Sequence, residues 1–169
     1  MRKNLFGAVL LLLLLGFIGC YSFRGISIDP EVTTFSVRVF DVTAPNAPPS
    51  SGIDFAERFK DKIRTQTRLK LVNENADIEF YGKINEYRVV AVAPQPGEIA
   101  SENRLEVGVS VGLNNNKDDK KSWITEKSYR HNAVFSNTQD LLNVQDELLN
   151  RQIYPQLLED IFNAAFNDW

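Results

Sequence analysis

Cysteine and histidine, the residue types that build many catalytic and metal sites, each occur once in this sequence. Because Cys20 has no partner cysteine, no disulfide can form within the chain. Because His131 is the sole histidine, a Ser-His-Asp arrangement has one available base, and zinc lacks the several Cys or His ligands that it usually takes. The chain also has no glycine-rich phosphate loop. These absences argue against an enzyme, a bound metal and a cofactor.

An excess of positive charge is missing as well. Lys and Arg number 19 against 22 Asp and Glu, so the formal net charge is −3. A nucleic-acid-binding protein would concentrate basic residues on one surface, so we expect no nucleic-acid partner. The chain also lacks an apolar run of the about 20 residues that a membrane-spanning helix needs.

The N-terminus has the three parts of an export signal. Arg2 and Lys3 form a positively charged start, an apolar stretch follows from Leu5 to Ile18, and the small residue Gly19 ends it. Cys20 stands where such a signal is cut. The segment that ends in Cys20 resembles a lipobox, in which the thiol is acylated, with palmitate as an acyl chain, and becomes the mature N-terminus. An ordinary signal with an incidental thiol is the alternative.

These features predict three segments. Residues 1–19 form a cleaved signal peptide, residues 20–31 a lipidated tether, and residues 32–169 a single domain. Loss of the signal changes the formal net charge from −3 to −5. It leaves about 150 residues, the size of one compact domain.

The first part of the domain predicts a strand and then a helix. Residues 33–42 alternate between apolar and polar types, with Val39 among those on the apolar face, which is typical of a half-buried strand. Apolar residues recur at helical spacing from Phe55 to Ile63, and Ser51 or Asp54 is available to cap this helix. The proline-rich stretch between the two elements indicates a loop.

Three longer alternating stretches follow, near residues 78–84, 105–113 and 123–134. Because polar tips join them, they predict an antiparallel meander with one apolar face that must be covered.

The C-terminal segment supplies the cover. Apolar residues form a stripe from Leu141 to Phe166, and residues 136–139 have the pattern of a capping box. Pro155 interrupts this helix, so we predict a kink or break near residues 150–154. The predicted fold is therefore α+β, in the order β-α-β-β-β-α. Two helices pack on one face of a four-stranded, mainly antiparallel sheet.

Basic residues give one candidate binding site. Arg64, Arg68 and Lys70 belong to a locally basic stretch at the end of the first helix, and such side chains bind phosphates. A solvated helix face is the alternative interpretation.

Outward-facing aromatic and apolar residues give a second candidate. Tyr81, Tyr87 and Val89 are predicted on the wet face of the long hairpin, where they would form a partner surface. The alternative is that the sheet twists and buries them. We interpret His131 as a strand residue without a catalytic role.

Several ordered blocks of the sequence resemble one known family. They are Cys20–Gly25, Thr67–Val72, Asp77–Gly82, Asn103–Val107 and Leu158–Asn163. The chain is similar over nearly all of its mature length to the lipopolysaccharide-assembly lipoproteins of the LptE type, in a divergent branch.

The resemblance implies a function as well as a fold. Such proteins are outer-membrane lipoproteins on the periplasmic side, in which two helices pack on a four-stranded sheet. They occupy the lumen of a large β-barrel, LptD, assist its assembly and plug it while lipopolysaccharide passes to the cell surface, without enzymatic activity. Arg64, Arg68 and Lys70 then become a hypothesis for direct lipopolysaccharide binding. The alternative function is a stand-alone, periplasm-facing lipoprotein that binds a small amphiphile.

Overall fold

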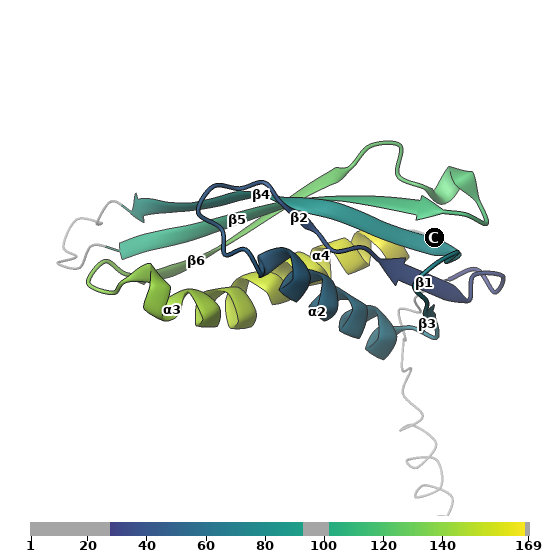
Figure 1. Ribbon diagram of the computed structural model, residues 1–169, viewed down its shortest axis with the longest axis horizontal. Helices are drawn as coiled ribbons and strands as arrows, with labels where there is room; N and C mark the ends of the chain where they lie inside the picture. The colour runs from purple at the N-terminus through teal and green to yellow at the C-terminus, as the bar shows by residue number, and fades with distance from the viewer. Residues whose placement is uncertain (1–27, 93–101, 168–169) are drawn as a thin grey trace, which may run out of the picture.

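The computed structural model describes residues 28–92 and 102–167, which form two layers (Figure 1). One layer is a sheet with the strands β1 (Thr34–Val37), β2 (Asp41–Val42), β3 (Lys70–Leu71), β4 (Ile78–Val92), β5 (Glu102–Asn115) and β6 (Lys127–Ser136). The other layer contains the helices α2 (Ser51–Gln66), α3 (Leu141–Glu147) and α4 (Tyr154–Phe166). The predicted signal, Cys20 and most of the predicted tether lie outside the described residues.

The sheet has six strands in the order β3-β1-β4-β5-β6, with β2 also paired to β4. The pairs β4–β5 and β5–β6 are antiparallel, whereas β1 and β2 pair with β4, and β1 with β3, in parallel. The predicted α+β class is confirmed. The predicted four-stranded, mainly antiparallel sheet is wrong, since the sheet has six strands and three parallel pairs. The sequence does not reveal β2 and β3 because strands of two residues are too short to give a periodic signal.

The single strand predicted for residues 33–42 is also wrong. β1 ends at Val37, and Val39, which was expected on the apolar face, is 56% exposed. The next residue, Phe40, is buried instead, and its ring packs edge-on against Phe55 with 5.0 Å between the ring centroids. Between β1 and β2 the alternation of buried and exposed side chains is therefore interrupted, which brings Phe40 under helix α2.

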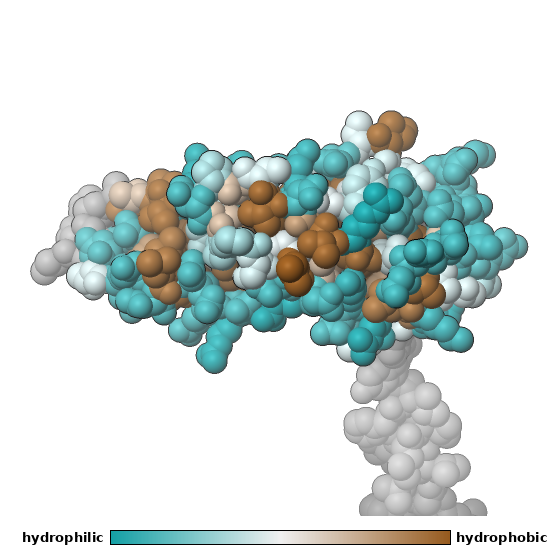
Figure 2. Space-filling view, in the orientation of Figure 1, coloured by the Kyte–Doolittle hydropathy of each residue, from teal (hydrophilic) through white to brown (hydrophobic). Residues whose placement is uncertain are grey.

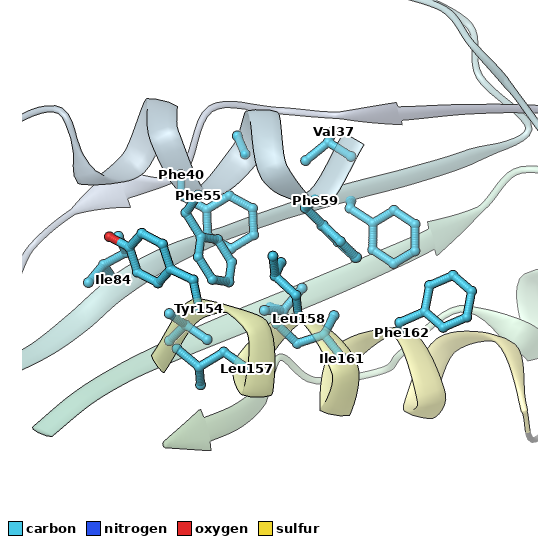
Figure 3. Packing of buried hydrophobic residues seen from close by; sticks show 14 of the residues in the cluster. Val37, Phe40, Phe55, Phe59, Ile84, Tyr154, Leu157, Leu158, Ile161 and Phe162 are labelled. Carbon is cyan, nitrogen blue, oxygen red and sulfur yellow. The ribbon is translucent and has the colours of Figure 1, made fainter. Parts of the chain in front are cut away.

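The core lies between the sheet and the helices (Figure 3). Phe55 and Phe59 lie on the buried side of α2, and Tyr154 lies on the buried side of α4. The Phe59 ring meets the ring of Phe80 from β4 at 4.8 Å, and Phe55 meets Tyr154 at 5.2 Å. Burying one such side chain is worth about 1.5–3 kcal/mol, so the contact of Phe59 with Phe80 helps attach α2 to the sheet, and the contact of Phe55 with Tyr154 helps attach α2 to α4.

The C-terminal helix contains the predicted irregularity. Residues Leu148–Ile153 form a π-helical turn between α3 and α4, and Pro155 follows in the first turn of α4. Proline has no backbone N–H to donate to the preceding turn, and the wider π turn accommodates this without a break in the rod. The buried residues of the π turn, such as Leu149, continue the apolar stripe.

Both helices begin differently from the prediction. Ser50 is the N-cap of α2, and its side chain makes no capping hydrogen bond. Asp140, rather than the predicted capping box at residues 136–139, caps α3, where its Oδ1 accepts a hydrogen bond from the backbone N–H of Leu142 at 3.0 Å.

The last strand starts later than predicted. The backbone N–H of Trp123 donates to the carbonyl of Leu113 at 2.9 Å, which closes a loop after β5. β6 therefore begins at Lys127 rather than at Trp123.

Candidate interaction surfaces

A β-bulge in β4 decides which of its side chains face outward. The pairing with β5 shifts between Ile84 and Glu86, so Asn85 is the extra residue. Relative to an uninterrupted alternation along the sequence, one inserted residue exchanges the inward and outward positions of all residues that follow it. Ile84 faces the helices before the bulge, and Tyr87 faces them after it.

The three residues predicted as a partner surface are therefore not brought together on one face. Tyr81 lies on the outward face, with its ring close over Gly112 of β5, where an added Cβ would come within 2.3 Å of the ring. Tyr87 is buried, and its hydroxyl hydrogen bonds to Oε1 of Gln145 at 3.1 Å. Burial raises the pKa of Tyr87 to about 12. Val89 shares the inner side with Tyr87 but is 44% exposed.

The outward face instead carries a row of ion pairs, here named the arginine–glutamate ladder. Arg88 Nη2 lies 2.7 Å from Glu106 Oε2, and Arg104 Nη2 lies 2.8 Å from the other oxygen of Glu106. Arg88 Nε also lies 2.9 Å from Glu86, which in turn binds Nε of Arg130 at 2.5 Å. The ladder thus joins β4, β5 and β6 across the sheet face that lies opposite to helices α2, α3 and α4.

The ladder keeps this sheet face charged and hydrated. The hydrogen bond from Arg88, ahead of the charges of Arg88 and Arg104, holds the pKa of Glu106 below its ordinary value. An open hollow of about 480 Å³ adjoins the ladder, and its lining includes Gly108 and Ser128 together with Glu86 and Arg130 of the ladder. Figure 2 shows the molecule in the orientation of Figure 1, in which the sheet lies above the helices. On the side in view, hydrophobic residues are scattered among hydrophilic ones.

Sequence reasoning missed the ladder. Its signal is visible once the register is known, because Arg88 of β4 then stands directly opposite Glu106 of β5 on the outward face. Opposite charges directly across strands stabilise a sheet, but the pairing register is needed to see them.

The predicted basic set lies where α2 runs into β3. Arg64 and Lys70 are exposed, and Arg64 Nη1 lies 3.4 Å from Asp61. Arg68 has a structural contact, because its Nη2 donates to the backbone carbonyls of Ile28 at 3.0 Å and Asp29 at 2.8 Å. The three cations are close in sequence, but one of them holds the start of the domain.

A carboxylate fixes the start of the sheet. Oδ2 of Asp77 accepts hydrogen bonds from the backbone N–H groups of Thr33 at 2.8 Å and Thr34 at 3.0 Å. The bond from the Thr33 backbone is the main reason that the pKa of Asp77 falls to about 2. Asp77 thereby attaches the first strand to the start of β4.

The single histidine of the chain has an acidic partner. His131 Nε2 lies 2.6 Å from Asp160 Oδ2, which links β6 to α4. Within residues 28–92 and 102–167, no three His, Cys, Asp or Glu side chains are placed to hold a metal ion. In the same part of the chain, no helix is both long and apolar enough to cross a membrane.

Comparison with protein families gives one match. A family model described as LptE, lipopolysaccharide-assembly, matches residues 32–165, which is most of the two-layer domain. Curated proteins give no significant match.

Solved structures share the architecture. A hypothetical protein from Chlamydia trachomatis aligns with a TM-score of 0.52 at 10% identity, over 80% of this chain and 98% of the other. A protein from Helicobacter pylori, described as a homolog of a neuraminyllactose-binding hemagglutinin, gives 0.52 at 9% identity, over 84% and 90%. The rare lipoprotein B from Shewanella oneidensis gives 0.46 at 12% identity, over 78% and 90%. At such identities the first two alignments show a common fold.

Proposed function

This chain belongs to the LptE family of lipopolysaccharide-assembly proteins, and from that membership we propose how it acts. It is an outer-membrane lipoprotein, anchored on the periplasmic side through lipid on Cys20. It binds an LptD-type β-barrel, helps the barrel to assemble and plugs its lumen while lipopolysaccharide passes to the cell surface. On this proposal the protein performs no chemistry of its own. The family match over residues 32–165 is the observation that carries it.

The character of the exposed sheet face supports a place inside a barrel. Lumens of large barrels are polar and hydrated, so a plug needs a surface that stays stable in water while it contacts polar walls. The arginine–glutamate ladder gives the sheet such a surface, with the side chains of Arg88 and Arg130 58% and 61% exposed. Paired charges also give directional contacts to polar groups of a partner. We therefore take this face, which includes Tyr81, as the surface that meets the barrel.

Copurification tests the partnership. The full-length lipoprotein with a C-terminal tag is isolated from detergent-solubilised outer membranes, and bound proteins are identified by mass spectrometry. We expect a large β-barrel protein in a near-equimolar amount. Recovery of the lipoprotein alone, with its lipid intact, would contradict the plug function and favour the stand-alone binder of an amphiphile.

A pair of charge reversals tests the surface. Arg130→Glu changes the outward sheet face at β6, and Arg151→Glu is the matched control on the π turn, where the side chain is 78% exposed. We expect Arg130→Glu to reduce the amount of barrel recovered and Arg151→Glu to leave it unchanged. Equal recovery by both variants, with equal thermal unfolding temperatures, would exclude this face as the barrel contact.

Direct lipopolysaccharide binding is proposed for Arg64, Arg68 and Lys70. Replacing all three with Ser should weaken binding of purified lipopolysaccharide, because each change removes a cation that pairs with phosphate. Since Arg68 also holds the backbone of Ile28, Arg68→Ser alone serves as the control for a structural effect. Unchanged affinity in the triple variant would remove the idea. A loss that Arg68→Ser alone reproduces in full would assign the effect to structure.

A further inference from the structure

The loop between β5 and β6, residues 116–126, presents an apolar residue to solvent on a rigid frame. Ile124 is 101% exposed, the highest value among the exposed large hydrophobic residues in the part of the chain that the structure describes. The neighbouring Trp123 is half-buried, and the ammonium of Lys127 lies 4.3 Å from the centre of its ring. An exposed isoleucine next to a tryptophan and a lysine is the composition of a segment that meets a lipid surface.

Hydrogen bonds from backbone N–H groups, most of them to side-chain oxygens, hold this loop in shape. Oδ1 of Asn115 accepts from the N–H groups of Lys117 at 2.9 Å and Asp118 at 3.0 Å. The N–H of Asn115 donates to Oγ of Ser122 at 2.8 Å, and the N–H of Trp123 bonds back to β5. The loop geometry therefore keeps Ile124 exposed. Because the loop is already ordered, contact between Ile124 and another surface costs little conformational entropy.

The loop lies beside the point where the described chain begins. Nζ of Lys121 is 3.8 Å from Asp29, and the N–H of Asn116 donates to the carbonyl of Asp77, the residue that binds Thr33. Only residues 21–27 separate Cys20 from Ile28. Since an extended chain spans at most about 3.6 Å per residue, this tether reaches under about 30 Å. A lipid on Cys20 keeps this end of the domain close to the membrane.

The loop carries charges of both signs in equal number, Lys117, Lys120 and Lys121 against Asp118, Asp119 and Glu126. Lys117 lies 3.5 Å from Asp77 and Lys121 lies 3.8 Å from Asp29, so the exposed Lys120 is the loop lysine that can reach a phosphate-bearing surface. Lysine ammonium groups on flexible stems reach phosphate headgroups, while tryptophan prefers the boundary between headgroups and acyl chains.

We propose that the loop of residues 116–126 rests on the membrane leaflet that holds the lipid anchor, with Ile124 inserted between the lipids and Lys120 at the phosphate headgroups. This inference rests on the proposed function, because it requires Cys20 to be lipidated. It gives the elongated domain an orientation, in which the end with β1 and β3 lies at the membrane and the end with α3 lies away from it (Figure 1).

Tryptophan fluorescence tests the contact. Trp169→Phe leaves Trp123 as the sole tryptophan, because the sequence contains two. This lipidated full-length protein is reconstituted into vesicles of phosphatidylethanolamine and phosphatidylglycerol, with or without bromine on the acyl chains. We expect the brominated lipids to quench Trp123, and Ile124→Asp to abolish this quenching. Leu142→Asp is the control, since Leu142 is 72% exposed on α3, and it should leave quenching unchanged.

Three results would overturn the inference: no quenching in the parent protein, equal quenching in Ile124→Asp, or an N-terminal peptide without lipid by mass spectrometry. Copurification of the barrel is measured on the same variants to separate the two proposals. A barrel that is retained without quenching refutes the membrane contact alone. Quenching without any barrel refutes the plug function and supports the contact.

Discussion

Gly52 of α2 allows a close approach between the helix and the chain beneath it. An added Cβ would lie 2.0 Å from the carbonyl oxygen of Phe40 and 3.2 Å from Cγ2 of Val42. The oxygen belongs to the backbone, so no side-chain rotation relieves the contact. Gly52→Ala should therefore destabilise the protein, even though alanine is the better residue in an ordinary helix by about 1 kcal/mol.

The magnitude follows from opposing effects. Forcing a methyl group against fixed backbone costs roughly 3 kcal/mol, the upper end for overpacked cores. Moving α2 away from β2 also weakens the edge-on contact of Phe40 with Phe55, which is worth about 1 kcal/mol. Against these stands the gain of about 1 kcal/mol in helix propensity. We expect a net loss of about 3 kcal/mol in the free energy of unfolding.

Urea unfolding monitored by circular dichroism measures this loss. Thr65→Ala in the same helix is the control, because Thr65 is exposed and should change stability by less than about 0.5 kcal/mol. If Gly52→Ala were as stable as the parent or more stable, the close approach of α2 to Phe40 would be refuted.

Three further predictions concern the sheet. Because folding lowers the pKa of Asp77 from 3.8 to about 2, its carboxylate stabilises the fold above about pH 4 and loses that effect as the pH falls to 2. Asp77→Asn should therefore flatten the pH dependence of the unfolding temperature between about pH 4 and pH 2. Tyr87→Phe should cost about 1 kcal/mol in urea unfolding by removing the hydrogen bond to Gln145, and an unchanged midpoint would contradict that bond. Deleting Asn85 should remove the bulge and keep Glu86 opposite Gly108 and Tyr87 opposite Val107, so it should cost only about 1 kcal/mol for the lost hydrogen bond from Asn85 to Ser110, whereas a sharp drop of the urea midpoint would show that Asn85 is not the extra residue.

The sequence predicts the long, strongly periodic elements well. The five alternating apolar residues of β5 from Leu105 to Leu113 are all buried, and the apolar stripes of α2 and α4 face the sheet. The irregularity before Pro155 also has a local cause, since proline lacks the N–H that the helix requires. Each of these features depends on residues within one element.

Long-range features are the ones that local patterns miss. β1 was expected to continue through Val39 because nothing near it in sequence reveals that Phe40 must meet Phe55. The bulge at Asn85 is hidden because one inserted residue leaves the composition of the strand unchanged, yet it separates Tyr81 from Tyr87. Predictions of a binding surface are the most sensitive to such errors, because one register shift exchanges the outward side chains for the buried ones.

The parallel pairing of β1 sets a constraint on the order in which the protein can fold. Thr34 and its contact Asp77 are 43 residues apart, whereas β4 and β5 are consecutive strands of one antiparallel pair. Synthesis proceeds from the N-terminus, so the first strand to be made must wait for the two-residue strand β3 and then for β4 before both of its edges are paired in the sheet. During that wait Phe35, fully buried in the finished domain, is exposed together with an unpaired strand edge. The N-terminal strand is thus a part of the chain that needs protection by chaperones until β4 has been made.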